Sequence, residues 1–335
     1  KYTFLYESVE KGSQKGRYSV IGLKPDLIWE CKNNICQLKD LNFSNKKMII
    51  NKKPLDSLKE LMNNNKLKLP YNIPSITTGI FGYMGYEMIQ YFEKINKQKK
   101  NNLKLPDSIF IRPSITLVFD NVNDKLFITK LVCKSKLNSK ESFDKAIVDI
   151  YKIVEKINKP IPKVNYSSHN KNKKINIFKN VKSNTNFDEF KKMVNKAKKY
   201  IFEGEIFQVV LSRVFTKKIE TDPLSIYRAL RYLNPSPYLF FMNFKDFTIV
   251  GSSPEILIKL EDKKVTIRPI AGTRKRGKNN IEDESLKKDL INDPKEISEH
   301  LMLLDLGRND ISRVTKPGTV KVTDKMYIEY FSHVM

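Results

Sequence analysis

The sequence contains few cysteines, few histidines and no long apolar segment. Its 335 residues include three cysteines, three histidines and one tryptophan. No run of about eighteen apolar residues, the length that a membrane-spanning helix requires, occurs in the chain. The first residues also lack the order of basic, apolar and small segments that marks a signal peptide. We therefore expect a cytoplasmic protein that does not enter a membrane.

The three cysteines form neither a metal-binding nor a disulfide pattern. Cys31 and Cys36 lack the spacing of a metal site and have no histidine nearby, and Cys133 makes their number odd. We predict reduced thiols. None of them lies in a turn typical of a cysteine nucleophile, so no glutaminase is predicted in this chain.

Acidic residues are scarce relative to basic ones. Lysine and arginine total 62, aspartate and glutamate total 37, and the formal net charge at pH 7 is +25. Clustered cations would indicate contacts with nucleic-acid phosphates. Here lysine is dispersed along the whole chain among abundant asparagine and isoleucine, which is typical of a solvated surface. We predict no nucleic-acid partner, although the positive field would attract anionic small molecules.

The length suits one large or two ordinary domains, and 40% of the residues are hydrophobic. A polar segment at residues 159–184 is rich in lysine and asparagine and contains two prolines. We predict that it links an N-terminal domain at residues 1–158 to a second domain at residues 185–335. The chain begins without methionine, so we also expect an upstream part of the protein before Lys1.

The first domain alternates apolar and polar residues in the manner of antiparallel strands. Strands are predicted at residues 17–22, 27–31, 48–50, 109–119 and 125–132. A helix is predicted to begin at Pro54, with Leu55, Leu58, Leu61 and Met62 facing inward, and a second helix has an apolar stripe from Phe143 to Ile157. Gly79, Gly82 and Gly85 match neither a dinucleotide-binding fingerprint nor a P-loop. We predict that they allow backbones to pack closely.

The second domain mixes helices and short strands. One helix is predicted from Phe187 to a stop at Gly204, and another from Pro223 to the residue before Asn234. Strands are predicted at residues 206–213, 238–242 and 247–250, and a hairpin is predicted from residues 255–260 and 264–269. Small residues followed by three cations at residues 270–277 form either an anion-binding corner or a basic surface loop.

A short amphipathic helix near the end of the chain carries the most informative acids. Asp293 is predicted as its N-cap, Pro294 as its first residue, and Gly307 as its stop. Glu296 and Glu299 are three residues apart and therefore share one face. Such a pair suits a hard divalent cation such as Mg²⁺. Alternatively, Glu296 completes a capping box and both acids simply complement the helix dipole.

Five motifs in a fixed order resemble the large-subunit family of anthranilate synthase, which consists of chorismate-utilising enzymes. They are Phe-Gln-Val-Val-Leu-Ser at 207–212, Asn-Pro-Ser-Pro-Tyr at 234–238, Gly-Ser-Ser-Pro-Glu at 251–255, Arg-Pro-Ile-Ala-Gly-Thr-Arg at 268–274, and Glu-His-Leu-Met-Leu-Leu-Asp-Leu-Gly-Arg-Asn-Asp at 299–310. Leu-Tyr-Glu-Ser at 5–8 resembles the family's N-terminal region, so the resemblance covers essentially the whole chain.

The resemblance implies an α+β fold, with an antiparallel β-sandwich core and flanking helices. It also implies that Mg²⁺ holds the carboxylate of chorismate while ammonia adds and pyruvate leaves, which yields anthranilate for tryptophan biosynthesis. By the same resemblance, Glu299 is a Mg²⁺ ligand, Glu296 its supporting or water-mediated partner, and Gly272 and Thr273 lie against the substrate.

Two positions favour anthranilate formation over related reactions. Relatives that add water carry a lysine base where this chain has Gln208, and glutamine cannot act as that base. Aminodeoxychorismate synthases commonly carry a lysine where this chain has Ala271. The resemblance therefore implies a lyase that receives ammonia from a glutamine amidotransferase partner in a hetero-oligomer, with aminodeoxychorismate synthase as the alternative.

The resemblance further implies feedback inhibition by tryptophan. Glu7 and Ser8 match one side of the inhibitor pocket, and Pro237, Tyr238 and Leu239 match the other. Glu7 would pair with the ammonium group of tryptophan, or it is an ordinary strand acid.

The family's catalytic histidine would follow Met335 directly, and the second pair of metal-binding acids would lie further on. No catalytic residue is therefore assigned within the chain. We expect the C-terminal part of the fold to be missing, the 335 residues alone to be inactive, and a non-catalytic fragment that retains tryptophan binding to be a further alternative.

Overall fold

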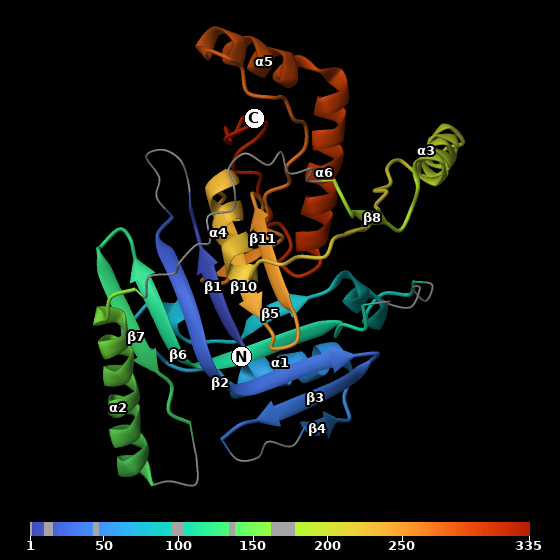
Figure 1. The fold of residues 1–335 in the computed structure, drawn as a ribbon. Coiled ribbons are helices and arrows are strands. Elements are labelled where there is room, and N and C mark those ends of the chain that lie inside the picture. Colours follow the sequence, from blue (N-terminus) through green and yellow to red (C-terminus); the bar gives the residue numbers. More distant parts are fainter. Residues whose placement is uncertain (1, 10–15, 43–46, 96–102, 134–137, 162–177) are drawn as a thin grey trace. The chain divides into compact units, whose positions relative to one another are not determined.

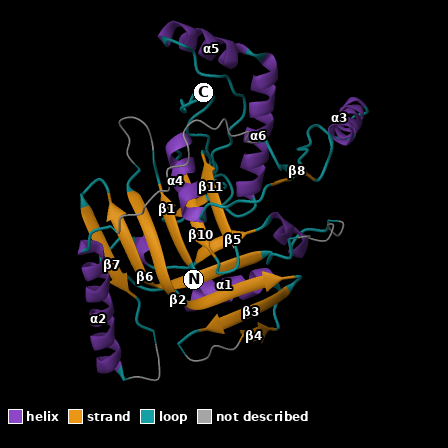
Figure 2. Cartoon of the chain, viewed as in Figure 1, coloured by secondary structure: helices purple, strands orange, loops and turns teal. Residues whose placement is uncertain are grey.

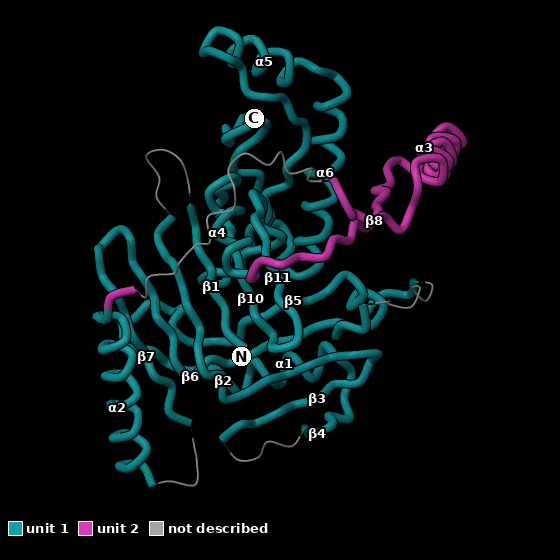
Figure 3. Tube along the Cα trace, in the orientation of Figure 1, with its two compact units in different colours: residues 1–159, 223–335 teal, residues 160–222 magenta. Residues whose placement is uncertain are grey.

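The computed structural model describes residues 2–9, 16–42, 47–95, 103–133, 138–161 and 178–335. The chain forms two compact units, one of residues 1–159 and 223–335 and the other of residues 160–222 (Figure 3). The predicted linker lies largely outside the described residues. The domain limits 1–158 and 185–335 stay a prediction, although strands from both of these ranges share one sheet of the larger unit.

The larger unit is built on a nine-stranded antiparallel sheet (Figures 1 and 2). Its strands are β1 (Thr3–Glu7), β2 (Tyr18–Lys32), β3 (Ile35–Asp40), β4 (Lys47–Ile50), β5 (Phe81–Met84), β6 (Ser108–Asp120), β7 (Lys125–Lys130), β10 (Tyr238–Asn243) and β11 (Thr248–Ser253). Helices accompany this sheet, so the structure confirms the predicted α+β class.

The long strands β2 and β6 belong to two layers at once. The first half of β2 pairs with β1 and its second half with β3, and the register with β6 shifts between Pro25 and Leu27. β6 likewise pairs with β5 through its first half and with β7 through its second half. The two predicted strands at 17–22 and 27–31 are therefore one strand, bent at a bulge, which forms part of both layers of the sandwich.

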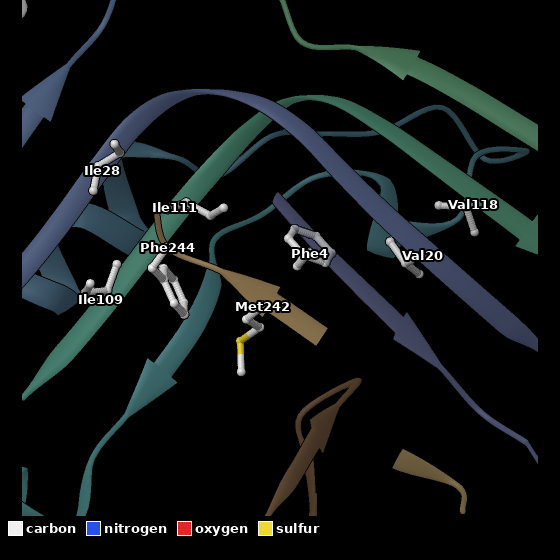
Figure 4. Close-up of a cluster of buried hydrophobic side chains, with 8 residues drawn as sticks. All are labelled: Phe4, Val20, Ile28, Ile109, Ile111, Val118, Met242 and Phe244. Carbon is white, nitrogen blue, oxygen red and sulfur yellow. The ribbon is translucent and has the colours of Figure 1, made fainter. Parts of the chain in front are cut away.

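The main core contains side chains from both layers (Figure 4). Its buried members are Phe4, Val20, Ile28, Ile109, Ile111, Val118, Met242 and Phe244. Gly22 makes room for the ring of Phe4, because a Cβ at Gly22 would lie 2.1 Å from Phe4 Cε1. The core side chains come from β1, β2, β6, β10 and the turn after β10, so the core joins the N-terminal strands to β10.

Gly82 of β5 and Gly85, which follows this strand, confirm the prediction of close backbone packing. The prediction was wrong for Gly79, where the nearest atom to a Cβ would be a side-chain atom of Phe81 at 3.8 Å and where a φ of +140° favours glycine instead. A Cβ at Gly82 would lie 1.8 Å from the carbonyl oxygen of Ile109, and one at Gly85 would lie 2.8 Å from that of Asp107. Neither position accommodates a side chain without moving the backbone of β6 or of the segment that precedes it.

Helix α1 (Pro54–Asn64) covers a second apolar cluster, next to two short 3₁₀ helices at Ser75–Thr77 and Tyr86–Tyr91. Leu58 and Leu61 are buried as predicted, whereas Met62 is 54% exposed. The prediction for Met62 was wrong because the buried face of α1 runs through Pro54, Leu58 and Leu61 and does not reach the next position.

Helix α2 (Ser139–Asn158) begins with a capping box of Asn138 and Glu141. The predicted helix is confirmed, but only Ala146 on it is fully buried and Phe143 is exposed. Asp149 forms ion pairs with Lys24 of β2 and Lys130 of β7, which attach the helix to the sheet.

The smaller unit contains α3 (Phe187–Phe202), β8 (Lys182–Ser183) and β9 (Phe215–Thr216). A capping box at Asn186 opens α3, and Gly204, with a φ of 76°, follows its end as predicted. The predicted strand at 206–213 was wrong: these residues form no strand. A strand needs a hydrogen-bonded neighbour, and β8 pairs with β9 instead.

The remaining elements of the larger unit follow β11 or precede β10. They are α4 (Pro223–Leu233), the hairpin of β12 (Lys259–Glu261) and β13 (Lys264–Thr266), α5 (Asn280–Asn292) and α6 (Pro294–Ser312). Asp262 and Lys263 turn the hairpin with φ angles of 48° and 62°. No helix in the described ranges is both long and apolar enough to span a membrane.

Gly307 does not end α6, contrary to the prediction. The helix continues to Ser312, and a Cβ at Gly307 would lie 2.4 Å from Cδ1 of Ile267. The glycine therefore serves helix packing, since it lets the middle of α6 approach the segment that follows β13.

Candidate active site

A cavity of about 360 Å³ lies in the C-terminal part of the larger unit. Its wall consists of β13 and the loop after it, one side of α6, and parts of the last sixteen residues of the chain. Apolar side chains and several charged ones share this wall; the charged or titratable ones that matter below are Arg268, Glu296, His300, Arg308 and Glu329. A partly open cavity with a mixed apolar and charged surface suits a small anionic ligand with a ring.

Gly272 brings the loop backbone directly against α6. Its φ is +43°, a conformation that favours glycine, and a Cβ there would lie 3.2 Å from Oε2 of Glu296 and 3.0 Å from Cδ1 of Leu290. The absence of a side chain thus places Oε2 of Glu296 beside the loop at the cavity wall.

The start of α6 is organised as the sequence predicts. The carboxylate of Asp293 accepts hydrogen bonds from the backbone N–H groups of Lys295 at 2.9 Å and Glu296 at 3.4 Å. Burial acts to raise the pKa of Asp293, but these two bonds and the guanidinium of Arg274 lower it below its ordinary value. Because Asp293 is the N-cap of α6, Glu296 lies in the first turn of this helix.

Arg274 connects four groups around this corner. Its Nε donates to Asp289 at 2.6 Å, its Nη2 to Asp293 at 2.7 Å, and its Nη1 to Oε1 of Glu296 at 3.0 Å. Nη1 also donates to the carbonyl of Thr273 at 3.1 Å. Hydrogen bonds to Asp289 and Glu296 raise the pKa of Arg274 further above its ordinary value, so the guanidinium stays charged.

Residues 274–276 pair with the last residues of the chain. Arg274 and Met335 exchange two backbone hydrogen bonds, of 3.0 and 2.8 Å, and Arg276 N–H donates to the carbonyl of His333 at 3.1 Å. The side chain of Arg276 binds Asp283 with an Nε–Oδ2 distance of 3.0 Å. Both arginines of the predicted anion-binding corner therefore neutralise acids of the protein itself.

Arg268 makes a further charged contact at the cavity. Its Nη2 donates to the hydroxyl of Tyr327 at 3.0 Å and to the carboxylate of Glu329. All three residues line the cavity, so this contact joins the segment after β13 to the chain end across the site.

The structure brings some of the predicted site residues together. The cavity wall of the described chain includes Gly272 and Glu296, whereas Thr273 contributes its carbonyl to Arg274 and, like Glu299, does not line the wall. The capping-box interpretation of Glu296 is not the observed arrangement, since its Oε1 binds Arg274.

Helix α6 carries two carboxylates of the chemical type that Mg²⁺ prefers, of which Glu296 lines the cavity and Glu299 does not. Glu296 and Glu299 are carboxylates three residues apart on one helix, and Glu296 directs Oε2 toward Gly272. Mg²⁺ is usually held by one or two carboxylates together with water and substrate oxygens. Within the described residues there is no group of three or more His, Cys, Asp or Glu that could hold a metal, so these two acids would supply part of the ligand set.

Glu7, predicted to bind tryptophan, is the last residue of β1. Its Oε2 accepts hydrogen bonds from the hydroxyl of Tyr227 at 2.6 Å and from Nε of Arg231 at 3.1 Å, both on α4. Burial and the neighbouring carboxylate raise the pKa of Tyr227. Glu7 is therefore not an ordinary exposed strand acid.

The other predicted tryptophan-site residues surround the same strand end. Leu239 is opposite Glu7 in the β1–β10 pair and is fully buried, while Tyr238, next along β10, is exposed. Val9 N–H donates to the carbonyl of Ser236 at 3.0 Å, which brings the Ser8 segment close to Pro237. The assignment of these residues to tryptophan stays a prediction.

Sequence reasoning did not identify the roles of Arg274, Arg268, Tyr227 and Arg231. Arg274 was part of a basic run whose partners were unknown, and Tyr227 and Arg231 belong to an amphipathic helix with no motif around them. The only available signal was the four-residue spacing of Tyr227 and Arg231, which places them on one helix face.

Comparison with known proteins shows full-length similarity to one family. The family described as chorismate binding enzyme matches residues 3–335. The chain is 40% identical to anthranilate synthase component 1 of Cereibacter sphaeroides over 99% of this chain and 66% of that protein. It is also 40% identical to the protein of the same name from Acetivibrio thermocellus over 99% of this chain and 67% of the relative.

A solved structure has the same fold. The crystal structure of anthranilate synthase component I from Streptococcus pneumoniae matches with a TM-score of 0.77 and 28% identity, covering 98% of this chain and 70% of that one. The present chain spans about two thirds of the length of the curated relatives that it matches.

Proposed function

The chain belongs to the chorismate-binding enzyme family, and on that premise we propose that it acts in the large subunit of an anthranilate synthase. The observation that carries the proposal is the contact between Gly272 and Glu296 at the cavity wall, because it joins two of the motifs that resemble that family. Identity of 40% to proteins named anthranilate synthase component 1 supports the same activity.

The proposed reaction converts chorismate and ammonia into anthranilate, pyruvate and water. Gln208 and Ala271 stand where relatives with other products carry lysine, so neither a lysine base for water nor a lysine nucleophile is present at these positions. The ammonia would come from a glutamine amidotransferase subunit in a hetero-oligomer.

The residues of this chain would act mainly by binding and orientation. Gly272 would let the loop lie against Glu296, so that the backbone of the loop and Oε2 of this carboxylate meet at the cavity wall where the substrate would bind. Glu296 and Glu299 would hold Mg²⁺, which supplies Lewis-acid polarisation of the substrate's ring carboxylate when bound. The apolar part of the wall, including Ile297 and Leu304, would exclude water from the ring.

The activity is tested with the protein at its full encoded length. With chorismate, Mg²⁺ and ammonium, fluorescent anthranilate and pyruvate should appear in equal amounts. Glu296→Gln should lower kcat/KM by about tenfold to a hundredfold, as loss of a ligand-orienting carboxylate does elsewhere. Glu284→Gln, an exposed acid of α5, is the matched control and should leave the rate unchanged. An aminated chorismate without pyruvate would instead indicate aminodeoxychorismate synthase.

We also propose that tryptophan inhibits through the site around Glu7. The Glu7 carboxylate, held by Tyr227 and Arg231, would accept the ammonium group of tryptophan. Calorimetric titration should show binding to the unaltered protein and at least about tenfold weaker binding to Glu7→Gln. Equal affinities would place the inhibitor elsewhere.

A further inference from the structure

We propose that Arg274 is the positioning residue of the substrate corner and that it acts through Glu296. The inference rests on the proposed function, since it concerns the same cavity. Arg274 does not line that cavity, and its guanidinium lies behind the wall, in contact with three carboxylates.

The two oxygens of Glu296 point in different directions. Oε1 accepts from Arg274 Nη1 at 3.0 Å, whereas Oε2 lies at the position that a Gly272 side chain would contact. The Glu296 side chain is 18% exposed, so few alternative positions are open to it. Arg274 thus holds one oxygen while the other remains directed at the loop and the cavity.

The same guanidinium also restrains the loop. Nη1 donates to the Thr273 carbonyl, and the Arg274 backbone is paired with Met335 on both sides. Asp289 and Asp293 bind the other nitrogens from the end of α5 and the start of α6. Loop, α5 and α6 are therefore connected through one planar group, whose fixed geometry a lysine ammonium cannot reproduce.

The experiment makes two measurements on the protein at its full encoded length. The first is the affinity for Mn²⁺, a spectroscopic substitute for Mg²⁺, and the second is the affinity for chorismate in the presence of Mg²⁺. Arg274→Lys keeps the positive charge but loses the fork, and both affinities should fall about tenfold to a hundredfold. Arg17→Lys is the matched control: Nε and Nη2 of this arginine donate to the Asp120 carboxylate at 3.4 and 3.3 Å, and the residue does not line the cavity. Its affinities should stay within about twofold of the unaltered protein.

A second variant separates positioning from folding. Asp289 is 62% exposed and does not line the cavity, and its carboxylate accepts a hydrogen bond from Arg274 Nε at 2.6 Å. Asp289→Asn should weaken chorismate binding by about two- to fivefold in the unaltered protein and have no further effect in Arg274→Lys. If Arg274→Lys does not fold, the effect of Asp289→Asn decides the question alone.

The outcomes are distinguishable. Unaltered affinity in Arg274→Lys, or unaltered affinity in Asp289→Asn where the first variant does not fold, overturns the positioning role while the proposed function stands. Independent, multiplying effects of the two substitutions also overturn it. If the unaltered protein itself binds no chorismate, the proposed function fails and this inference fails with it.

Discussion

The ion pair of Asp26 and Arg112 offers a direct measure of what burial does to a charge contact in this fold. Arg112 Nε lies 2.7 Å from Asp26 Oδ1, and the two side chains are only 13% and 6% exposed. Arg112 also donates to Asn65 at the end of α1. Asp26 occupies the bulge at which β2 bends from one layer to the other, so the pair supports the bend.

Replacing Arg112 by methionine keeps most of the apolar volume and leaves Asp26 as a buried carboxylate. Its remaining side-chain partners include the Asn42 amide, at 3.3 Å, and the Cys133 thiol. Loss of one member of a buried pair costs about 3–5 kcal/mol of unfolding free energy. The Asn42 contact puts the expectation at the lower end, about 3 kcal/mol.

Lys52 and Glu60 provide the matched control. Their N–O distance of 2.8 Å is nearly the same, but the side chains are 48% and 47% exposed. Lys52→Met should therefore cost about 0–1 kcal/mol. The two pairs have nearly equal contact distances and differ strongly in exposure, so the contrast between the variants reflects mainly burial, together with the Arg112–Asn65 hydrogen bond.

Urea unfolding followed by tryptophan fluorescence measures both variants. Trp29 is the only tryptophan, is fully buried, and donates to Ser57 at 2.8 Å, so its emission reports the layer in which Arg112 lies. Adding Asp26→Asn to Arg112→Met should recover part of the loss. A loss in Arg112→Met no larger than in Lys52→Met would refute the reasoning.

Three further predictions concern glycines and one acid. Gly272→Ala should lower the free energy of unfolding by about 1–2 kcal/mol because of its positive φ, and it should also weaken chorismate binding. Gly318 has a φ of 76° and no atom within 4 Å of the position that a Cβ would occupy, so Gly318→Ala should lower stability in thermal unfolding without changing chorismate binding. Gly82→Ala should abolish hydrogen-exchange protection across β5, because its Cβ would overlap the Ile109 carbonyl, and retained protection would contradict this. Although burial acts to raise it, hydrogen bonds from Asn123 and Arg17 lower the pKa of Asp120 to about 2, so its contribution is present above pH 4 and lost toward pH 2. Asp120→Asn should accordingly destabilise the protein at pH 7 and not at pH 2, and a pH-independent difference in denaturant midpoints would disprove this.

Local rules predicted most elements that depend on neighbouring residues. Asp293 caps α6, Gly204 follows α3, and Asp262 with Lys263 turns the β12–β13 hairpin, because each depends on contacts within about four residues. The close packing of Gly82 was also predicted from its spacing alone.

Predictions that depended on a distant partner were the ones that went wrong. Gly307 was predicted to end a helix, but Ile267 packs against it and α6 continues. The apolar segment at 206–213 had strand character but no strand beside it. Met62 was placed on the buried face of a helix whose orientation is decided by the sheet below it.

The candidate site divides in the same way. Residue types and motif order by themselves determined the family resemblance, the start of α6, and the two acids that share its face, since these are properties of adjacent residues. Only the tertiary structure decided that Glu296 contacts Gly272, that Arg274 binds three carboxylates, and that Glu7 is held by α4. Charge contacts of this kind join segments that are up to 224 residues apart, and their formation depends on the packing of the sheet and helices between them.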